Sequence, residues 1–138
     1  MKNSGKHIRL LVNSILGEFV RMYYALFPIE SQRARAENRP EGGRVIVTLT
    51  SYGRRVGKTL PYTVYSLLRQ SAAPDMIVIW LDENHWSDDT LPPRLASLKE
   101  KGLVDVRYCE DIRSYKKLIP SLSCFPDDML VTVDDDLF

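Results

Sequence analysis

The sequence has little cysteine, no long apolar run and almost no excess of charge. It contains only two cysteines, Cys109 and Cys124, which are too few for a disulfide framework or a cysteine-based zinc site. We interpret both as reduced thiols of a cytosolic protein. The 19 Lys and Arg residues against 18 Asp and Glu leave a formal charge of +1. The chain therefore lacks the general basic field of a nucleic-acid-binding protein, and we expect no nucleic-acid partner.

No apolar segment approaches the ~18 residues that a membrane-spanning helix needs. The apolar run Leu10-Leu11-Val12 is interrupted soon afterwards by Asn13 and Glu18, and no small-residue cleavage site follows it. These features exclude a signal peptide. We expect a cytoplasmic protein, with peripheral contact at the inner face of the cell membrane as the alternative.

The composition is that of one globular domain. Apolar residues make up 44% of the 138 residues and charged residues 27%, which disfavours disorder, collagen and a coiled-coil rod. We divide the chain into an N-terminal helix within residues 1–29, a polar linker at 30–43 and a folded domain at 44–138.

An amphipathic helix is predicted over residues 8–27, before Pro28. Its stripe follows spacings of four and three residues: Ile8, Val12, Ile15, Phe19, Met22 and Leu26. Three partners remain open for this stripe, namely the domain itself, a second copy of the chain and a membrane surface. Basic residues accompany the stripe and fit the third partner: Lys2, Lys6, Arg9 and Arg21.

From residue 44 onward the sequence alternates between strands and helices. Four apolar, β-branched or alternating runs predict strands at 45–50, 76–81, 103–108 and 129–133. The helices between them are predicted from Thr59 to Leu68, from Thr90 to Lys101, where Gly102 ends the helix, and from Ser114 to Leu122. This order predicts an α/β fold with a Rossmann-like parallel sheet.

Parallel sheets of this kind bind ligands beyond the carboxyl ends of their strands, where the strand order reverses. If the first and fourth strands are neighbours at that point, Ser51 and Asp134 face the same crevice. The topology alone therefore predicts the place of a binding site.

Three consecutive carboxylates follow the fourth strand, and we call them the aspartate cluster: Asp134, Asp135 and Asp136. Hard carboxylate oxygens suit Mg²⁺ or Mn²⁺, which usually also hold phosphate oxygens. Strand alternation predicts that Asp134 and Asp136 point together as metal ligands, while Asp135 points away. An acidic turn without a metal is the alternative.

Further candidates lie at other strand ends. Asp82 ends the second strand, where a carboxylate can accept hydrogen bonds from a ribose or a base; capping of a loop is the alternative. Hydroxyls and arginines follow the first strand in the segment 50–55, and Arg113, Lys116 and Lys117 begin the third crossover helix. These groups suit a nucleoside and its phosphates, and ordinary surface placement is the alternative.

The segment Gly53 to Thr59 also resembles a Walker A loop. It has three residues between its glycines where the phosphate-binding loop needs four, and Pro61 follows closely. A P-loop NTPase is therefore the least favoured of our hypotheses.

Several segments together resemble the opening of bacterial nucleotide-sugar glycosyltransferases of the GT-A fold, of the family-2-like type found with polysaccharide and capsule genes. The segments are Val45 to Tyr52, Ser66 to Gln70, Pro74 to Leu81, Asp111 to Pro120 and Phe125 to Asp136. The likeness covers about residues 44–138.

The resemblance implies that Asp134 and Asp136 hold Mn²⁺ or Mg²⁺, which bridges the diphosphate of a nucleotide-sugar donor, a UDP-sugar first of all. It also implies nucleoside contacts at Thr50, Ser51 and Asp82. Lys117 or Arg113 would lie near the phosphates, and we count Asp134 and Asp135 among the residues that bind the donor.

Enzymes of this fold continue beyond the Asp-x-Asp motif, and that later part supplies the site for a saccharide or lipid-linked acceptor and, in inverting members, the catalytic base. We therefore expect a donor-binding half that transfers sugar only as part of a longer chain. The alternative is a catalytically incomplete interaction module. We also expect the last strand to leave an apolar sheet edge open.

Overall fold

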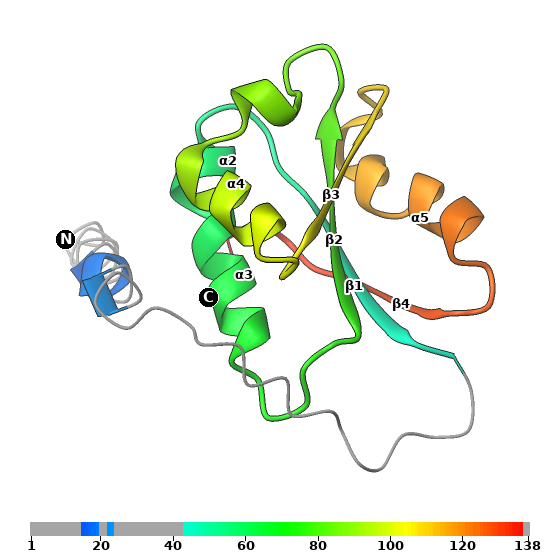
Figure 1. Cartoon of the computed structure of the whole chain (residues 1–138), viewed down its shortest axis with the longest axis horizontal. Coiled ribbons are helices and arrows are strands. Elements are labelled where there is room, and N and C mark those ends of the chain that lie inside the picture. Colours follow the sequence, from blue (N-terminus) through cyan, green and yellow to red (C-terminus); the bar gives the residue numbers. More distant parts are fainter. Residues whose placement is uncertain (1–14, 20–21, 24–42, 137–138) are drawn as a thin grey trace, which may run out of the picture. The chain divides into compact units, whose positions relative to one another are not determined.

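The structure is a computed structural model that describes residues 15–19, 22–23 and 43–136 (Figure 1). The chain divides into two compact units, Met1–Glu30 and Ser31–Phe138. Most of the predicted helix at 8–27 and of the linker at 30–43 lies outside the described residues.

In the first unit, residues 15–19 and 22–23 are helical. The apolar stripe predicted there is exposed at each position described: Ile15, Phe19 and Met22 are 49%, 59% and 52% exposed. Contact of this stripe with the domain, a second copy of the chain or a membrane surface stays a prediction. Within the described residues, no helix combines the length and apolar character needed to cross a membrane.

The second unit is built on a four-stranded sheet in which every neighbouring pair is parallel. Its strands are β1 (Val45–Thr50), β2 (Met76–Asp82), β3 (Asp105–Cys109) and β4 (Met129–Thr132). The spatial order is β3-β2-β1-β4. The predicted α/β fold with a Rossmann-like parallel sheet is confirmed.

Helical segments connect the strands, and they lie on both faces of the sheet (Figure 1). Their bounds are α2 (Arg55–Lys58), α3 (Leu60–Leu68), η1 (Asp88–Thr90), α4 (Pro93–Glu100), η2 (Arg113–Lys117) and α5 (Ile119–Cys124). On one face, Val47, Leu49 and Ile79 of the sheet pack with apolar residues of α3 and α4. On the other, Phe125 closes a smaller cluster with Ile46, Val78 and Trp80.

Two helical regions differ from the prediction. The short helix α2 precedes α3, so Thr59 lies between two helices and its hydroxyl donates to the Arg55 carbonyl oxygen instead of capping α3. The helix predicted from Ser114 to Leu122 is divided into the 3₁₀-helix η2 and the helix α5, with Leu118 between them. Pro120 fits in the first turn of a new helix because it needs no backbone donor there.

The amino ends of β1 and β4 are fastened to each other by an ion pair. Asp128 accepts hydrogen bonds from the backbone nitrogen of Arg44 at 2.9 Å and from its Nη2 at 2.7 Å. Gly43 precedes this contact with a φ of 44°, and a Cβ added there would lie 2.6 Å from the carbonyl oxygen of Asp127. The entry to the sheet is therefore closely packed around a glycine.

β4 is the outermost strand of the sheet and is poorly covered. Among the described residues it pairs with β1 alone. Met129 is 55% exposed and Val131 is 39% exposed. The predicted open apolar edge is present within this part of the chain.

Candidate functional site

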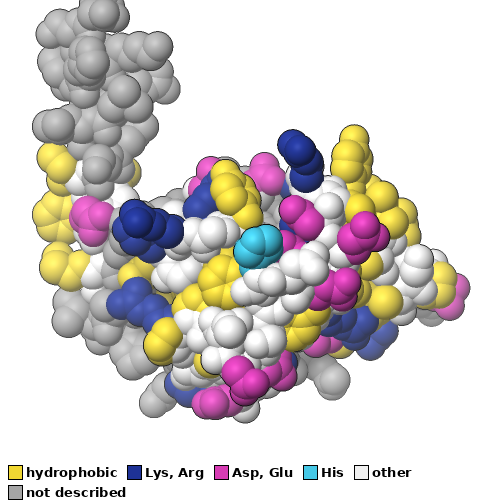
Figure 2. All heavy atoms as spheres, turned by 90° about the horizontal axis from the view of Figure 1, so that it is seen from above, with side chains coloured by type: hydrophobic (Ala, Val, Ile, Leu, Met, Phe, Trp, Pro, Cys, Tyr) yellow, Lys and Arg dark blue, Asp and Glu magenta, His cyan; other side chains and the backbone are white. Residues whose placement is uncertain are grey.

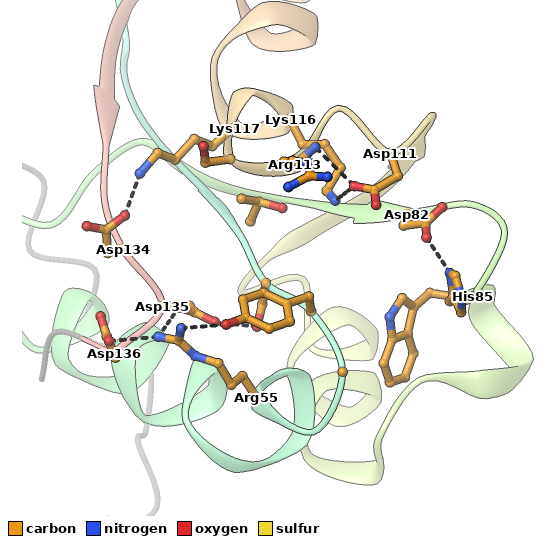
Figure 3. A pocket seen from close by; sticks show the side chains of 16 residues that line it. Arg55, Asp82, His85, Asp111, Arg113, Lys116, Lys117, Asp134, Asp135 and Asp136 are labelled. Carbon is orange, nitrogen blue, oxygen red and sulfur yellow. Dashed lines mark hydrogen bonds and ion pairs between the residues drawn. The ribbon is translucent and has the colours of Figure 1, made fainter.

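A cleft of about 950 Å³ opens at the carboxyl ends of the strands, where the strand order reverses between β1 and β4 (Figure 3). Its size is that of a small-ligand site. It is lined by Thr50, Ser51, Tyr52, Gly53, Arg55, Asp82, His85, Trp86, Asp111, Arg113, Ser114, Lys116, Lys117 and the aspartate cluster. Acidic and basic side chains are interspersed over the face of the molecule drawn in Figure 2. The site residues predicted from the sequence line this one cleft, with the exception of Arg54 in the segment 50–55.

Ser51 and Asp135 join the two strand ends across the cleft. The Ser51 hydroxyl donates a hydrogen bond of 2.5 Å to Asp135 Oδ2. Both residues are buried, with 2% and 5% of their surface exposed. The predicted convergence of the segments that follow the first and fourth strands is confirmed.

The predicted direction of Asp135 is wrong. We expected strand alternation to turn it away from the crevice, but β4 ends at Thr132 and residues 135–136 form a turn. Alternation holds only while the backbone stays extended. In the turn, Asp135 lines the cleft and reaches both Ser51 and Arg55.

Each carboxylate of the aspartate cluster has a cationic partner. Lys117 Nζ lies 2.5 Å from Asp134 Oδ1, and this hydrogen bond lowers the pKa of the Asp134 carboxyl below its usual value. Arg55 Nη2 lies 2.5 Å from Asp135 Oδ1 and 2.7 Å from Asp136 Oδ2. Figure 3 shows Lys117 and Arg55 reaching the cluster from different walls of the cleft.

The chemistry of the aspartate cluster fits a divalent cation, because hard carboxylate oxygens line one cleft together. Asp134 and Asp136 are the exposed members and would hold the ion. Their present partners are the cations of Lys117 and Arg55, and within residues 15–19, 22–23 and 43–136 no three acidic, His or Cys side chains are gathered for metal binding. A bound cation would therefore replace these ion pairs.

Asp82 lies at the other end of the cleft, at the end of β2 (Figure 3). Its Oδ1 accepts a hydrogen bond of 2.9 Å from the backbone nitrogen of Asn84, and its Oδ2 contacts His85 Nδ1. The Asn84 bond first, and then the His85 contact, lower the pKa of the Asp82 carboxyl. Asp82 therefore caps the loop after β2, as the alternative proposed, and still presents a carboxylate to the cleft.

Arg113 lines the cleft and has an unusual backbone conformation. Its φ is 57°, in the left-handed region that disfavours residues with a side chain. Asp111 Oδ1 accepts a hydrogen bond of 3.0 Å from the Arg113 backbone nitrogen and supports this turn. The same carboxylate contacts Lys116 Nζ, whose side chain is only 4% exposed. The Lys116 bond, followed by the Arg113 bond, lowers the pKa of the Asp111 carboxyl.

Asp111 is a site residue that our sequence reasoning missed as a candidate. A weak signal was available, since an Asp side chain often accepts a hydrogen bond from the backbone nitrogen two residues further on and so forms a tight turn. Asp111 fixes the loop that carries the cations to the cleft.

A buried polar network lies behind Lys117. The Thr48 hydroxyl on β1 donates to the Lys117 carbonyl oxygen at 2.7 Å and contacts the Ser121 hydroxyl at 3.0 Å. Trp80 Nε1 on β2 donates to the same Ser121 hydroxyl at 2.7 Å. Buried polar groups without partners are costly, so this network holds η2 in one position against the sheet. The sequence predicts Thr48 only as a strand residue. It does not reveal that the Thr48 hydroxyl bonds to the Lys117 carbonyl oxygen.

The hydroxyls of Thr50 and Ser51, which we predicted to contact a nucleoside, already donate hydrogen bonds within the protein. Thr50 Oγ1 donates to the Trp80 carbonyl oxygen at 2.8 Å, and the Ser51 hydroxyl donates to Asp135. Both protons are already used within the protein. With this hydrogen bonding, each hydroxyl can offer a ligand only its acceptor lone pairs.

The Walker-like segment is helical where a phosphate-binding loop would be open. Residues Arg55–Lys58 form α2, and the exposed Lys58 is not among the described residues that line the cleft. This geometry gives the P-loop hypothesis no support.

Comparisons with family models, with curated proteins and with solved structures found no match to this chain. The fold and the site geometry therefore carry the functional argument.

Proposed function

We propose that the cleft binds the nucleoside diphosphate of a sugar nucleotide, and that this chain is the donor-binding half of a GT-A-like glycosyltransferase. The observation that carries the proposal is the meeting of Ser51 and Asp135 at the point where the strand order reverses. Ligands of open parallel sheets bind at such a point. The resemblance noted in the sequence supports the same substrate class.

The charges in the cleft suit an elongated anionic ligand. The aspartate cluster lies at one end and Asp82 at the other, with Arg113, Lys116 and Lys117 along the wall between them (Figure 3). A carboxylate at the Asp82 end can accept hydrogen bonds from a ribose or base. Arg113 and Lys117 can meet phosphate oxygens, whereas the buried Lys116 contacts Asp111.

In this proposal, Asp134 and Asp136 hold Mn²⁺ or Mg²⁺ at the diphosphate end. A bound divalent cation supplies Lewis-acid stabilisation of the negative charge on a departing nucleoside diphosphate. The chain's own residues bind and orient the donor: Asp82 at the nucleoside, Arg113 and Lys117 at the phosphates. Asp135 positions the turn of the cluster through Ser51.

Thermal denaturation of the full chain tests this proposal. We expect UDP with Mn²⁺ to raise the melting temperature more than either alone, because a ligand that binds only the folded state stabilises it by mass action. The double variant Asp134→Ala and Asp136→Ala should lose that increase. The matched control, Glu100→Gln on the exposed surface of α4, should keep it.

The absence of any increase in a well-folded wild-type sample would contradict the proposal. An increase with ATP and Mg²⁺ but none with UDP, abolished by Lys58→Ala, would instead support a P-loop NTPase.

A further inference from the structure

Arg55 is the cation closest to the centre of the aspartate cluster. Its Nη2 lies within 2.7 Å of one oxygen of Asp135 and one of Asp136. Its guanidinium carbon lies 5.4 Å from the centre of the Tyr52 ring, and Nη1 is 3.5 Å from the Tyr52 hydroxyl. The side chain is 32% exposed, so it is partly withdrawn from water and held from two sides.

The planar guanidinium suits this bridging position. Nη2 carries two N–H donors and can donate to both carboxylates while the planar guanidinium lies over the Tyr52 ring, a combination that the compact ammonium of a lysine does less well. Asp134 is engaged separately by Lys117. Arg55 and Lys117 therefore offset two of the three negative charges of the aspartate cluster.

A divalent cation needs the same oxygens. A guanidinium that donates to Asp136 Oδ2 occupies a lone pair of that oxygen and places a positive charge beside it, so it disfavours a metal ion at the same oxygen. Asp135 keeps its second oxygen on Ser51 and does not depend on Arg55 alone for its orientation. Competition between Arg55 and a divalent cation therefore takes place mainly at Asp136.

We propose that Arg55 is a built-in counter-cation of the aspartate cluster, which competes with the divalent ion and sets the cation affinity of the site. The inference rests on the proposed function, because it requires that the cluster bind a metal ion. On binding, the guanidinium leaves Asp136 and remains in the cleft against the Tyr52 ring. The positive charge thus stays beside the ligand.

Titration of the full chain with Mn²⁺ alone, followed by the electron paramagnetic resonance signal of the free ion, tests this competition. We expect Arg55→Gln to bind Mn²⁺ about two- to fivefold more tightly than the wild type, since removal of a partly exposed ion pair changes affinity by roughly this factor. Arg54→Gln is the matched control. Arg54 is the preceding, exposed arginine outside the cleft lining, and its substitution should leave the affinity unchanged.

Arg55→Lys keeps the positive charge and guards against a failure of Arg55→Gln to fold. A lysine ammonium lacks the planar group that lies over the Tyr52 ring and is held less firmly at the carboxylates, so the affinity of this variant should lie between those of the wild type and Arg55→Gln. Equal Mn²⁺ binding by all three chains would overturn the competition and leave the metal site of the proposed function intact. No Mn²⁺ binding by any of them would overturn both.

Discussion

The Ser51 hydroxyl donates a hydrogen bond to Asp135 across a separation of 84 positions in the sequence. This contact joins the end of β1 to the turn after β4, and both strands are parallel neighbours. This topology brings the carboxylates, hydroxyls and cations of the cleft close together. The proposed function depends on that juxtaposition more than on any single motif.

The buried network behind Lys117 should contribute measurably to stability. Ser121→Ala leaves Trp80 Nε1 without its acceptor in the interior, so we expect a loss of about 1–3 kcal/mol in the free energy of unfolding. Chemical denaturation measures this loss. In a Trp80→Phe background, where the donor is already absent, the same substitution should cost less. Equal costs in both backgrounds would show that the indole hydrogen bond does not stabilise the domain.

The glycine at the entry to β1 should be hard to replace. Gly43→Ala places a Cβ 2.6 Å from the Asp127 carbonyl oxygen in a left-handed backbone, so we expect a loss of about 1–3 kcal/mol in stability. Gly102→Ala is the matched control, since Gly102 has a φ of 66° but no atom within 4 Å of the added Cβ. It should cost less, about 1 kcal/mol, because only the strain of a left-handed backbone is added. Equal costs measured by denaturation would mean that the close contact with Asp127 has no effect.

The fold could be predicted from the sequence further than the site could. β1 has the predicted bounds, and β2 differs by one residue, because β-branched apolar runs bounded by turns form buried strands. The helix α2 was missed, since its four residues include Gly57 and carry no apolar period of their own. The short α2 is stabilised by packing that one local stretch of sequence does not reveal.

Within the site, residue types were predictable and partners were not. The approximate strand ends placed Asp82, Ser51 and the aspartate cluster at one edge of the sheet, and the structure brings them to one cleft. The direction of Asp135 depends on the residue where β4 ends, which the sequence pattern does not define to one position. The contact of Thr48 with the Lys117 carbonyl depends on how η2 packs against β1.

Stability should fall in acid because of the ion pair at the entry to the sheet. The hydrogen bond from Arg44 lowers the pKa of Asp128 in the folded state, so this residue contributes stability above its unfolded pKa of about 4. That contribution is lost as the pH falls through the lower, folded pKa.

Asp128→Asn should therefore destabilise the protein at neutral pH and approach the wild type below the folded pKa. Urea denaturation at several pH values measures the difference, with Glu100→Gln as a surface control. A difference that stays constant with pH would contradict a role for the Asp128 charge.

The exposed edge of β4 should promote self-association. Unpaired strand edges with apolar side chains invite pairing with other chains, and a charge placed there opposes it. We expect Val131→Lys to reduce concentration-dependent association in sedimentation velocity. Leu122→Lys, which removes an exposed apolar residue from α5 instead, should have a smaller effect. If the two variants reduced association equally, the association would depend on exposed apolar surface in general and not on the β4 edge.

In the proposed function, a nucleoside diphosphate and its cation bind between the ends of β1 and β4. Paramagnetic broadening by Mn²⁺ in the presence of UDP, measured on the backbone amide resonances of the full chain, tests this most directly. We expect the amides of Ser51 and Asp135 to broaden together, while that of Gly102, which precedes β3 at the opposite edge of the sheet, stays sharp. Broadening that spares Ser51 and Asp135, or that affects Gly102 equally, would contradict the account.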